Sequence, residues 1–517
     1  MPPSSFRNAF PISNPGHSPT SSHFPFQQDD EITSKTTFLS FALHSFNALP
    51  LRRRIVLLST FIIGVLLTAI MKQESLIWLL TATAGAAPIL GWEQGSVFDY
   101  SGLRFGHDGR FQITVFSDLH LGDGARPGTD WPTIGVMDNV LWSEPGTDLV
   151  VLNGDLISCE WVDQNTANGL VDMIIDPLIR RNMPFTATFG NHDASRTCST
   201  KLLADRMWSK GNSPSHQLTW TANSLGTQYE GVGASNYYIP IYSSSGSGNP
   251  ELKMLLWFFD SKGGAKFDPE HDVKPEPESD WVSEKVVSWF KLTRDQIRAD
   301  HGGKVIPSLA FVHIPLSITE AFRKSGQRTE TTEPGISEEI INVQADDIPG
   351  GDLNFLQALS ETEGLIAAFS GHDHKIDWCM KYSSTRPVQG FNPPTSANDM
   401  SLCFGRHTGY GGYSDYERGA REIIVQEDKL GQNIVDTYIR LEGGRVSGYV
   451  TLNSTFGLDQ YPPVQKNKSW VNTEDQAAAE KSSFVTPSKP TSTSGDAPTS
   501  KATSNNDFHD GEGDANA

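Results

Sequence analysis

The stretch Phe111-Gln-Ile-Thr-Val-Phe-Ser-Asp118-Leu-His120 decides the expected fold, because an apolar run passes directly into ionisable residues. The same arrangement recurs where residues 149–152 lead to Gly154-Asp155, and where residues 185–189 lead to Gly190-Asn191-His192-Asp193. Each apolar run has the length and composition of a buried strand, and glycine or aspartate follows it. We therefore expect a sheet whose strands end in chemically active side chains.

The rest of the chain extends this pattern. Residues 255–259, 309–312 and 366–369 are further candidate strands. Residues 169–181 and 281–299 carry apolar residues at helical spacing, and Asp280 is the expected cap of the second helix. Alternating strands and helices predict an α/β fold with crossovers.

Polar blocks also follow the later strands. His313 ends one run, and Gly371-His372-Asp373-His374 ends another. Singly, each block is also typical of a turn or a buried core histidine. Because the carboxyl ends of strands meet at one edge of an α/β sheet, the blocks together predict a single site. Their carboxylate, amide and imidazole groups suit two metal ions.

In the type, order and spacing of these blocks over residues 108–420, the chain resembles the calcineurin-like metallophosphoesterase superfamily. Residues 371–378 and the stretch Cys403-Phe-Gly-Arg-His-Thr-Gly-Tyr-Gly-Gly-Tyr413 resemble its fungal and plant purple-acid-phosphatase-like branch. The resemblance implies an α/β four-layer sandwich, two mixed β-sheets flanked by helices, and a metal-dependent phosphoric ester hydrolase.

The resemblance also implies a ligand set. The first metal would be held by Asp118, His120, Asp155 and His374. Asp155 would bridge to the second metal, completed by Asn191, His313 and His372. Coloured purple acid phosphatases use a tyrosine three residues after the bridging aspartate, where this chain has Ser158. His120 would fill that vacancy, so no purple colour is expected, and Fe, Zn and Mn all remain open.

The implied mechanism assigns catalytic roles to His192, Asp155 and Asp118. A hydroxide shared by the two metals would attack phosphorus, and His192 would protonate the leaving group. Asp193 or Asp118 would hold the His192 imidazole. Arg406 and His407 lie in a Gly- and Tyr-rich loop that would either bind the substrate phosphate or remain solvated.

Three functions fit these residues. A phosphomonoesterase acting on phosphoprotein or a small phosphorylated metabolite comes first, and a phosphodiesterase or nucleotide hydrolase second. A noncatalytic, membrane-tethered binding protein is the remote alternative. A zinc peptidase is disfavoured because the chain lacks a His-Glu-x-x-His helix. The formal net charge of -20 argues against nucleic acid as a partner. No oligomeric state is assigned.

The chain is expected to divide into four parts. Residues 1–54 are expected to be disordered, residues 95–462 to form the catalytic domain, and residues 463–517 to form a disordered polar tail. Residues 55–90 are expected to act as a transmembrane anchor or a signal peptide, with a buried core helix as the alternative.

Both export interpretations depend on short features near that segment. Arg52-Arg53-Arg54 precedes an apolar run at residues 55–71, so the C-terminal part would be translocated from an anchor. Alternatively, translation starts at Met71 and cleavage follows near Ala87. Either way the catalytic part enters the secretory pathway and becomes membrane-bound, vacuolar, cell-surface or secreted.

The four cysteines and two polar segments also allow predictions. Pairing of Cys159 with Cys198 and of Cys379 with Cys403 competes with free buried thiols. Residues 209–250 and 262–280 are expected to be loop-like insertions bordering the active-site mouth.

Overall fold

The computed structural model describes residues 102–469, apart from 222–230, 245–249, 349 and 392–397. The expected disordered segment 1–54, the expected anchor or signal at 55–90 and most of the tail at 463–517 lie outside the described residues. Across the described ranges, no helix has the length and apolar character needed to cross a bilayer.

The first sheet has six strands in the order β14-β13-β12-β1-β2-β3. β1, β2 and β3 are parallel, and β12, β13 and β14 form an antiparallel extension beside β1. The bounds are β1 Arg110–Phe116, β2 Leu149–Asn153, β3 Phe185–Thr188, β12 Gly419–Gln426, β13 Val435–Leu441 and β14 Val446–Leu452.

The second sheet has six strands in the order β10-β11-β9-β8-β7-β6. β7, β8, β9 and β11 are parallel, and the two edge strands run antiparallel to their neighbours. The bounds are β6 Tyr237–Tyr242, β7 Leu252–Phe259, β8 Ser308–Val312, β9 Leu365–Ser370, β10 Cys379–Tyr382 and β11 Met400–Phe404. A separate hairpin joins β4 Asn212–Ser213 to β5 His216–Gln217.

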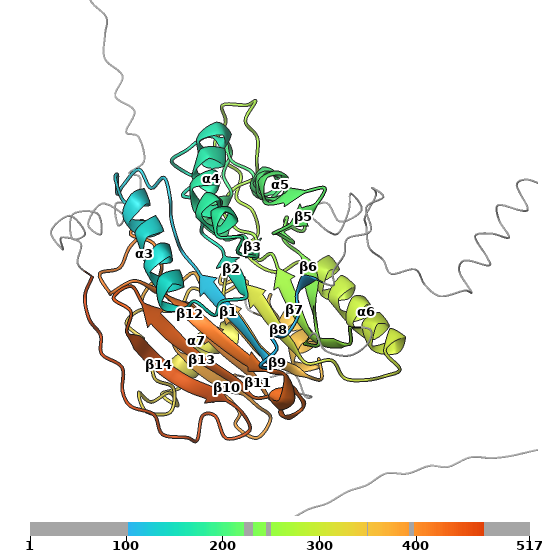
Figure 1. Cartoon of the computed structure of the whole chain (residues 1–517). Helices are drawn as coiled ribbons and strands as arrows, with labels where there is room; N and C mark the ends of the chain where they lie inside the picture. The colour runs from blue at the N-terminus through green and yellow to red at the C-terminus, as the bar shows by residue number, and fades with distance from the viewer. Residues whose placement is uncertain (1–101, 222–230, 245–249, 349, 392–397, 470–517) are drawn as a thin grey trace, which may run out of the picture. The chain divides into compact units, whose positions relative to one another are not determined.

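Helices cover the outer faces of both sheets (Figure 1). The first sheet packs against α3 Asp130–Ser143, α4 Gln164–Arg180 and α5 Thr200–Gly211. The second packs against α6 Glu284–Asp300, α7 Ser317–Lys324 and α8 Leu353–Ser360. Between the sheets lies a third core that includes Ile113, Val151, Phe311 and Phe369. The expected four-layer sandwich is confirmed.

Each strand predicted from an apolar run forms within two or three residues of its expected ends, because buried apolar runs leave little choice of face. Two local expectations were wrong. α6 is capped by Ser283, whose side chain accepts the Lys285 N–H, and not by Asp280. Residues 209–250 are not all loop, since they contain the edge strand β6, where Pro240 is tolerated.

Both expected cysteine pairs are disulfides, and the described residues contain no free cysteine. Cys379 and Cys403 face each other directly across β10 and β11. Cys159 and Cys198 join the loop after β2 to the segment after β3. The Cys159–Cys198 disulfide constrains the edge of the first sheet where the polar blocks lie.

Candidate metal centre

The seven predicted ligands gather where parallel strands end. Asp118 and His120 follow β1, Asp155 follows β2 and Asn191 follows β3. In the second sheet, His313 follows β8, and His372 and His374 follow β9. The two sheets therefore supply one centre between them, as the rule for strand ends predicts.

The side chains form two adjoining groups. Asp118, His120 and His374 place one ligand atom each within 4.8 Å of one another. Asp155, His313 and His372 do the same. All of these side chains are buried except that of His372, which is partly buried. Two buried sets of carboxylate and imidazole, with a shared boundary, fit a pair of borderline divalent or trivalent ions.

Asp155 lies at the boundary. Its Oδ2 is 3.0 Å from His313 Nε2 in one group and 3.7 Å from His120 Nε2 in the other. Its Oδ1 accepts the backbone N–H of His192 at 2.8 Å. One carboxylate oxygen thus faces both groups, while the other is engaged by the protein.

Four of the ligands sit in strained backbone. Asp118, His120, Asp155 and His372 have φ of 59°, 50°, 51° and 77°. The left-handed region costs a residue other than glycine on the order of 1–3 kcal/mol, and such residues cluster at functional sites. Gly190 is required for space and not for its φ, because a Cβ there would lie 2.3 Å from Asp155 Oδ1. The backbone therefore gives up stability to bring these side chains together.

Orphaned polar atoms test whether metal ions fit. Asn191 Oδ1 and His372 Nδ1 are buried and make no hydrogen bond to the protein, and His313 Nε2 meets only the carboxylate of Asp155 at 3.0 Å. An unpartnered buried polar atom is costly unless a ligand satisfies it. Burial lowers the pKa of His120 to about 4 and that of His372 to about 3, which leaves both imidazoles neutral and able to ligate. The residues present fit two ions.

Hydrogen bonds orient the imidazoles. His313 Nδ1 lies 2.8 Å from the Asn153 carbonyl oxygen, and His374 Nδ1 lies 2.7 Å from the Tyr413 carbonyl oxygen. Because a carbonyl only accepts, Nδ1 of His313 carries the hydrogen and its Nε2 is the atom directed at the centre. His374 Nδ1 lies between the carbonyl oxygen of Tyr413 and the backbone N–H of the same residue, 3.2 Å away, which fixes the orientation of the ring. His120 Nδ1 contacts Ser158 Oγ at 3.1 Å, so the residue at the position of the missing tyrosine supports His120.

His192 lines the centre, but its partner was predicted wrongly. Its Nδ1 lies 2.9 Å from Glu160 Oε1. Asp193 instead accepts the backbone N–H groups of Leu156, Ile157 and Gly190. Asp118 accepts the His372 N–H, so it does not hold the imidazole either. Burial alone would lower the pKa of His192, but the charges of Asp155 and Glu160 outweigh it and raise that pKa to about 9.

A cavity of about 520 Å³ opens over these residues, and its lining includes His120, Asp155, His192, His372 and His374. Arg126, Glu160, Trp161, Asn342 and Tyr413 complete much of its wall. A larger cavity of about 740 Å³ beside Trp208 and Trp220 contains no predicted site residue. The smaller cavity is therefore the candidate substrate site.

Arg406 and His407 do not line this cavity. The Arg406 guanidinium is buried against Asp377 Oδ2 at 2.5 Å and the Glu417 carbonyl oxygen, so it has no fork left for a phosphate. His407 is buried, and its ring stacks on His374 with centroids 3.9 Å apart. The expected contact of these residues with substrate phosphate is corrected: Arg406 forms a buried ion pair with Asp377, and His407 packs on the ligand His374.

Known proteins with sequences similar to this chain have names that contain the word phosphatase. The chain is 26% identical to "Probable inactive purple acid phosphatase 14" from Arabidopsis thaliana over 402 residues, covering 73% of this chain and 87% of the relative. It is 25% identical to "Probable inactive purple acid phosphatase 29" from the same plant, covering 63% and 79%. It is 27% identical to "Phosphatase DCR2" of Saccharomyces cerevisiae, covering 65% and 54%.

Among solved structures, the chain is similar to a dimetal phosphatase from Danio rerio, with 12% identity, a TM-score of 0.38 and coverage of 66% of this chain and 98% of that one. It is also similar to purple acid phosphatase PPD1 from yellow lupin, with 10% identity, a TM-score of 0.35 and coverage of 70% and 58%. The family model described as calcineurin-like phosphoesterase matches residues 111–375, just over half of the 517 residues. This chain belongs to the calcineurin-like phosphoesterase family.

Proposed function

We propose that this protein is a phosphomonoesterase that depends on two metal ions. The single observation that carries the proposal is the pair of buried ligand groups meeting at Asp155, beneath a cavity that His192 also lines. The name phosphatase among its relatives favours a monoester over a diester. The plant relatives carry the word inactive in their names, whereas this chain keeps all seven expected ligand positions and His192.

The ligand roles follow the two groups. Asp118, His120 and His374 would hold one ion, and Asn191, His313 and His372 the other, with Asp155 between them. When bound, such ions lower the pKa of a water molecule and neutralise charge on the phosphoryl oxygens. Fe, Zn and Mn all suit this donor set.

His192 would act as the general acid. Its Nδ1 is engaged by Glu160, so Nε2 is the ring nitrogen available to a substrate in the cavity. A protonated imidazole there gives its proton to the departing oxygen as the bond to phosphorus breaks. Glu160 keeps the ring oriented and favours its charged form.

The test combines metal analysis with hydrolysis assays on the purified full chain. We expect two bound metal ions per chain and faster cleavage of p-nitrophenyl phosphate than of its bis ester. Asp155→Ala should lose both metal and activity, while Asp428→Ala, an exposed control, should lose neither. Preferential cleavage of the bis ester would replace this proposal with the phosphodiesterase alternative. A protein that binds two metals yet releases no phosphate would refute it.

We also propose that the catalytic part works in an oxidising compartment of the secretory pathway. Its two disulfides support this, because such bonds persist mainly outside the reducing cytosol. Sequencing of the mature N-terminus decides between an anchor at residues 55–71 and cleavage near Ala87. Recovery of the protein with reduced cysteines from cytosol would contradict export.

A further inference from the structure

One aromatic side chain in the substrate cavity has no role in holding the centre. Trp161 lines the cavity, and 56% of its surface is exposed. A tryptophan is large and apolar, so this much exposed ring is a favourable surface for another flat apolar group. Its place beside the reacting groups makes substrate the natural occupant.

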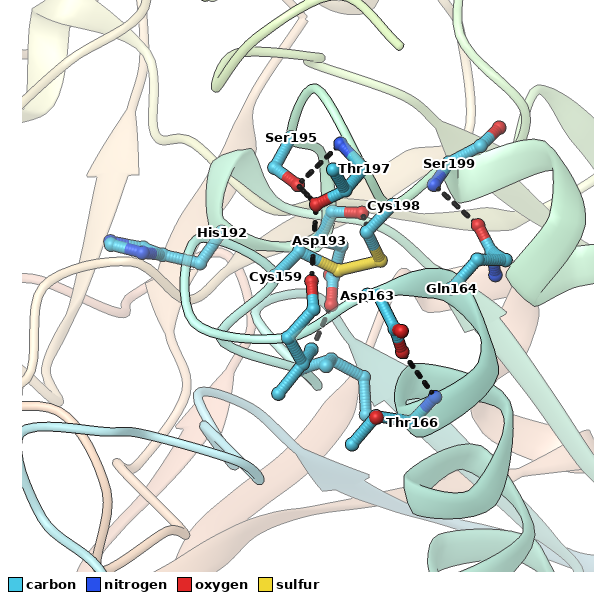
Figure 2. The surroundings of a disulfide bond; sticks show 12 residues. Cys159, Asp163, Gln164, Thr166, His192, Asp193, Ser195, Thr197, Cys198 and Ser199 are labelled. Atoms are coloured by element: carbon cyan, nitrogen blue, oxygen red, sulfur yellow. Dashed lines mark hydrogen bonds between the residues drawn. A yellow bond between two sulfur atoms is a disulfide. The ribbon is translucent and has the colours of Figure 1, made fainter. Parts of the chain in front are cut away.

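Trp161 is held close to the general acid. It follows Glu160, whose carboxylate contacts His192 Nδ1 at 2.9 Å. Cys159, two residues before Trp161, donates its backbone N–H to the His192 carbonyl oxygen at 2.9 Å. Figure 2 shows that Cys159 is also bonded to Cys198, just beyond His192. The segment that carries Trp161 is thus tied twice to the segment that carries the acid.

The indole rests on the backbone of the opposite loop. A Cβ on Gly124 would lie 2.5 Å from Trp161 Cε3, so only glycine leaves room for the ring there. The backbone N–H of Trp161 donates to the Ser158 carbonyl oxygen at 3.0 Å and closes a turn. The ring is therefore supported from one side and open to solvent elsewhere.

The other aromatic ring in the cavity wall is already occupied. Tyr413 stacks on His374 with centroids 4.1 Å apart, and Lys375 Nζ lies 5.7 Å from its centroid. Among the described residues that line the cavity, Trp161 is thus the aromatic ring available to a ligand.

We propose that Trp161 is a specificity-determining residue that stacks on the leaving group, and that the favoured substrates are aryl phosphate monoesters. This rests on the proposed phosphomonoesterase function. In the reaction, the oxygen of a water molecule forms a new bond to phosphorus and the bond from phosphorus to the phenolic oxygen breaks. The phenolic oxygen takes the proton of His192, and the proton that the water loses returns His192 to its charged form. The aromatic ring attached to that oxygen must lie near His192, on the side of the cavity where Trp161 stands.

The test separates binding from leaving-group chemistry by using inhibitors that cannot be hydrolysed. Inhibition constants of phenylphosphonate and ethylphosphonate are measured on metal-loaded full-length protein, for the wild type, Trp161→Ala, Trp161→Phe and Trp142→Ala. Trp142 is the matched control, since it is 87% exposed on α3 and does not line the cavity.

We expect Trp161→Ala to weaken phenylphosphonate by about tenfold, the upper range of an aromatic pair, and ethylphosphonate by less than about twofold. Trp161→Phe should restore most of the difference, and Trp142→Ala should change neither constant. The same selectivity should appear in kcat/KM for phenyl phosphate against glycerol 2-phosphate.

The two proposals fail differently. If wild-type protein releases phosphate but Trp161→Ala leaves the ratio of the two inhibition constants unchanged, the role of Trp161 is refuted and the phosphatase stands. If metal-loaded wild type releases no phosphate from either ester, the proposed function fails, and this inference fails with it.

Discussion

Replacing Glu422 by glutamine is expected to stabilise the protein above about pH 5. Glu422 lies on β12 and is fully buried. Its Oε2 accepts hydrogen bonds from Gln112 Nε2 at 2.8 Å and Thr114 Oγ1 at 2.9 Å, while Oε1 has no partner. Burial, followed by the nearby charge of Glu144, raises the pKa of Glu422 from 4.5 to about 8. The folded protein therefore keeps a proton on this carboxyl at neutral pH.

The sign of the effect follows from proton linkage. Between pH 4.5 and 8, the folded state holds a proton that the unfolded state has lost, so stability falls as pH rises through this window. One pKa unit corresponds to about 1.4 kcal/mol, so the full shift is worth at most about 5 kcal/mol. Glutamine keeps the shape without ionising. The advantage of Glu422→Gln should grow from near zero at pH 4.5 to a few kcal/mol at pH 8.

Urea unfolding at half-unit steps from pH 4.5 to 8.5 measures this, with metal content held constant. Glu270→Gln, on an exposed loop residue, is the control and should follow the wild type. A stability difference between wild type and Glu422→Gln that stays constant from pH 4.5 to 8.5 would show that the pKa of the buried carboxyl is not raised by folding, and would refute the reasoning.

Three further predictions concern the centre. Glu160→Gln should lower kcat at least about tenfold, because it weakens the contact that orients His192, and it should leave the metal content unchanged. The loss should be larger for esters with poorer leaving groups, and equal losses for all esters would contradict this role. Joint replacement of Cys159 and Cys198 by serine opens a loop of 39 residues and should cost about 4 kcal/mol in urea unfolding; an unchanged midpoint would contradict it. Arg406→Lys should lower the melting temperature with little change in KM, and a large rise in KM alone would return this residue to the substrate site.

The strands and the ligand positions could be predicted because both depend on local signals. An apolar run of five residues between polar breaks leaves few alternatives to a buried strand. Since parallel strand ends share an edge, ligand-type residues such as Asp155 and His313, placed directly after such runs, had to come together. Even the cysteine pairs could be suggested, from their positions beside these blocks.

Residues whose roles depend on what lies opposite them could not be predicted. Arg406 was expected either to bind the substrate phosphate or to remain solvated, but its guanidinium is buried against Asp377, 29 residues earlier in the chain. Asp193 or Asp118 was the expected partner of His192, yet Asp193 accepts backbone N–H groups after β2 and Asp118 accepts the N–H of His372. Glu160 carries no motif, and only the approach of two loops joined by a disulfide brings it to His192.

The sequence by itself determined which chemical groups the centre contains and the order in which the strands deliver them. The tertiary structure alone decided which carboxylate orients His192, which arginine forms a buried ion pair, and that Trp161 lines the cavity. The physical reason is that strand formation and strand-end position follow from short-range patterns, whereas the partner of a charge or a ring is chosen by packing between segments far apart in the chain.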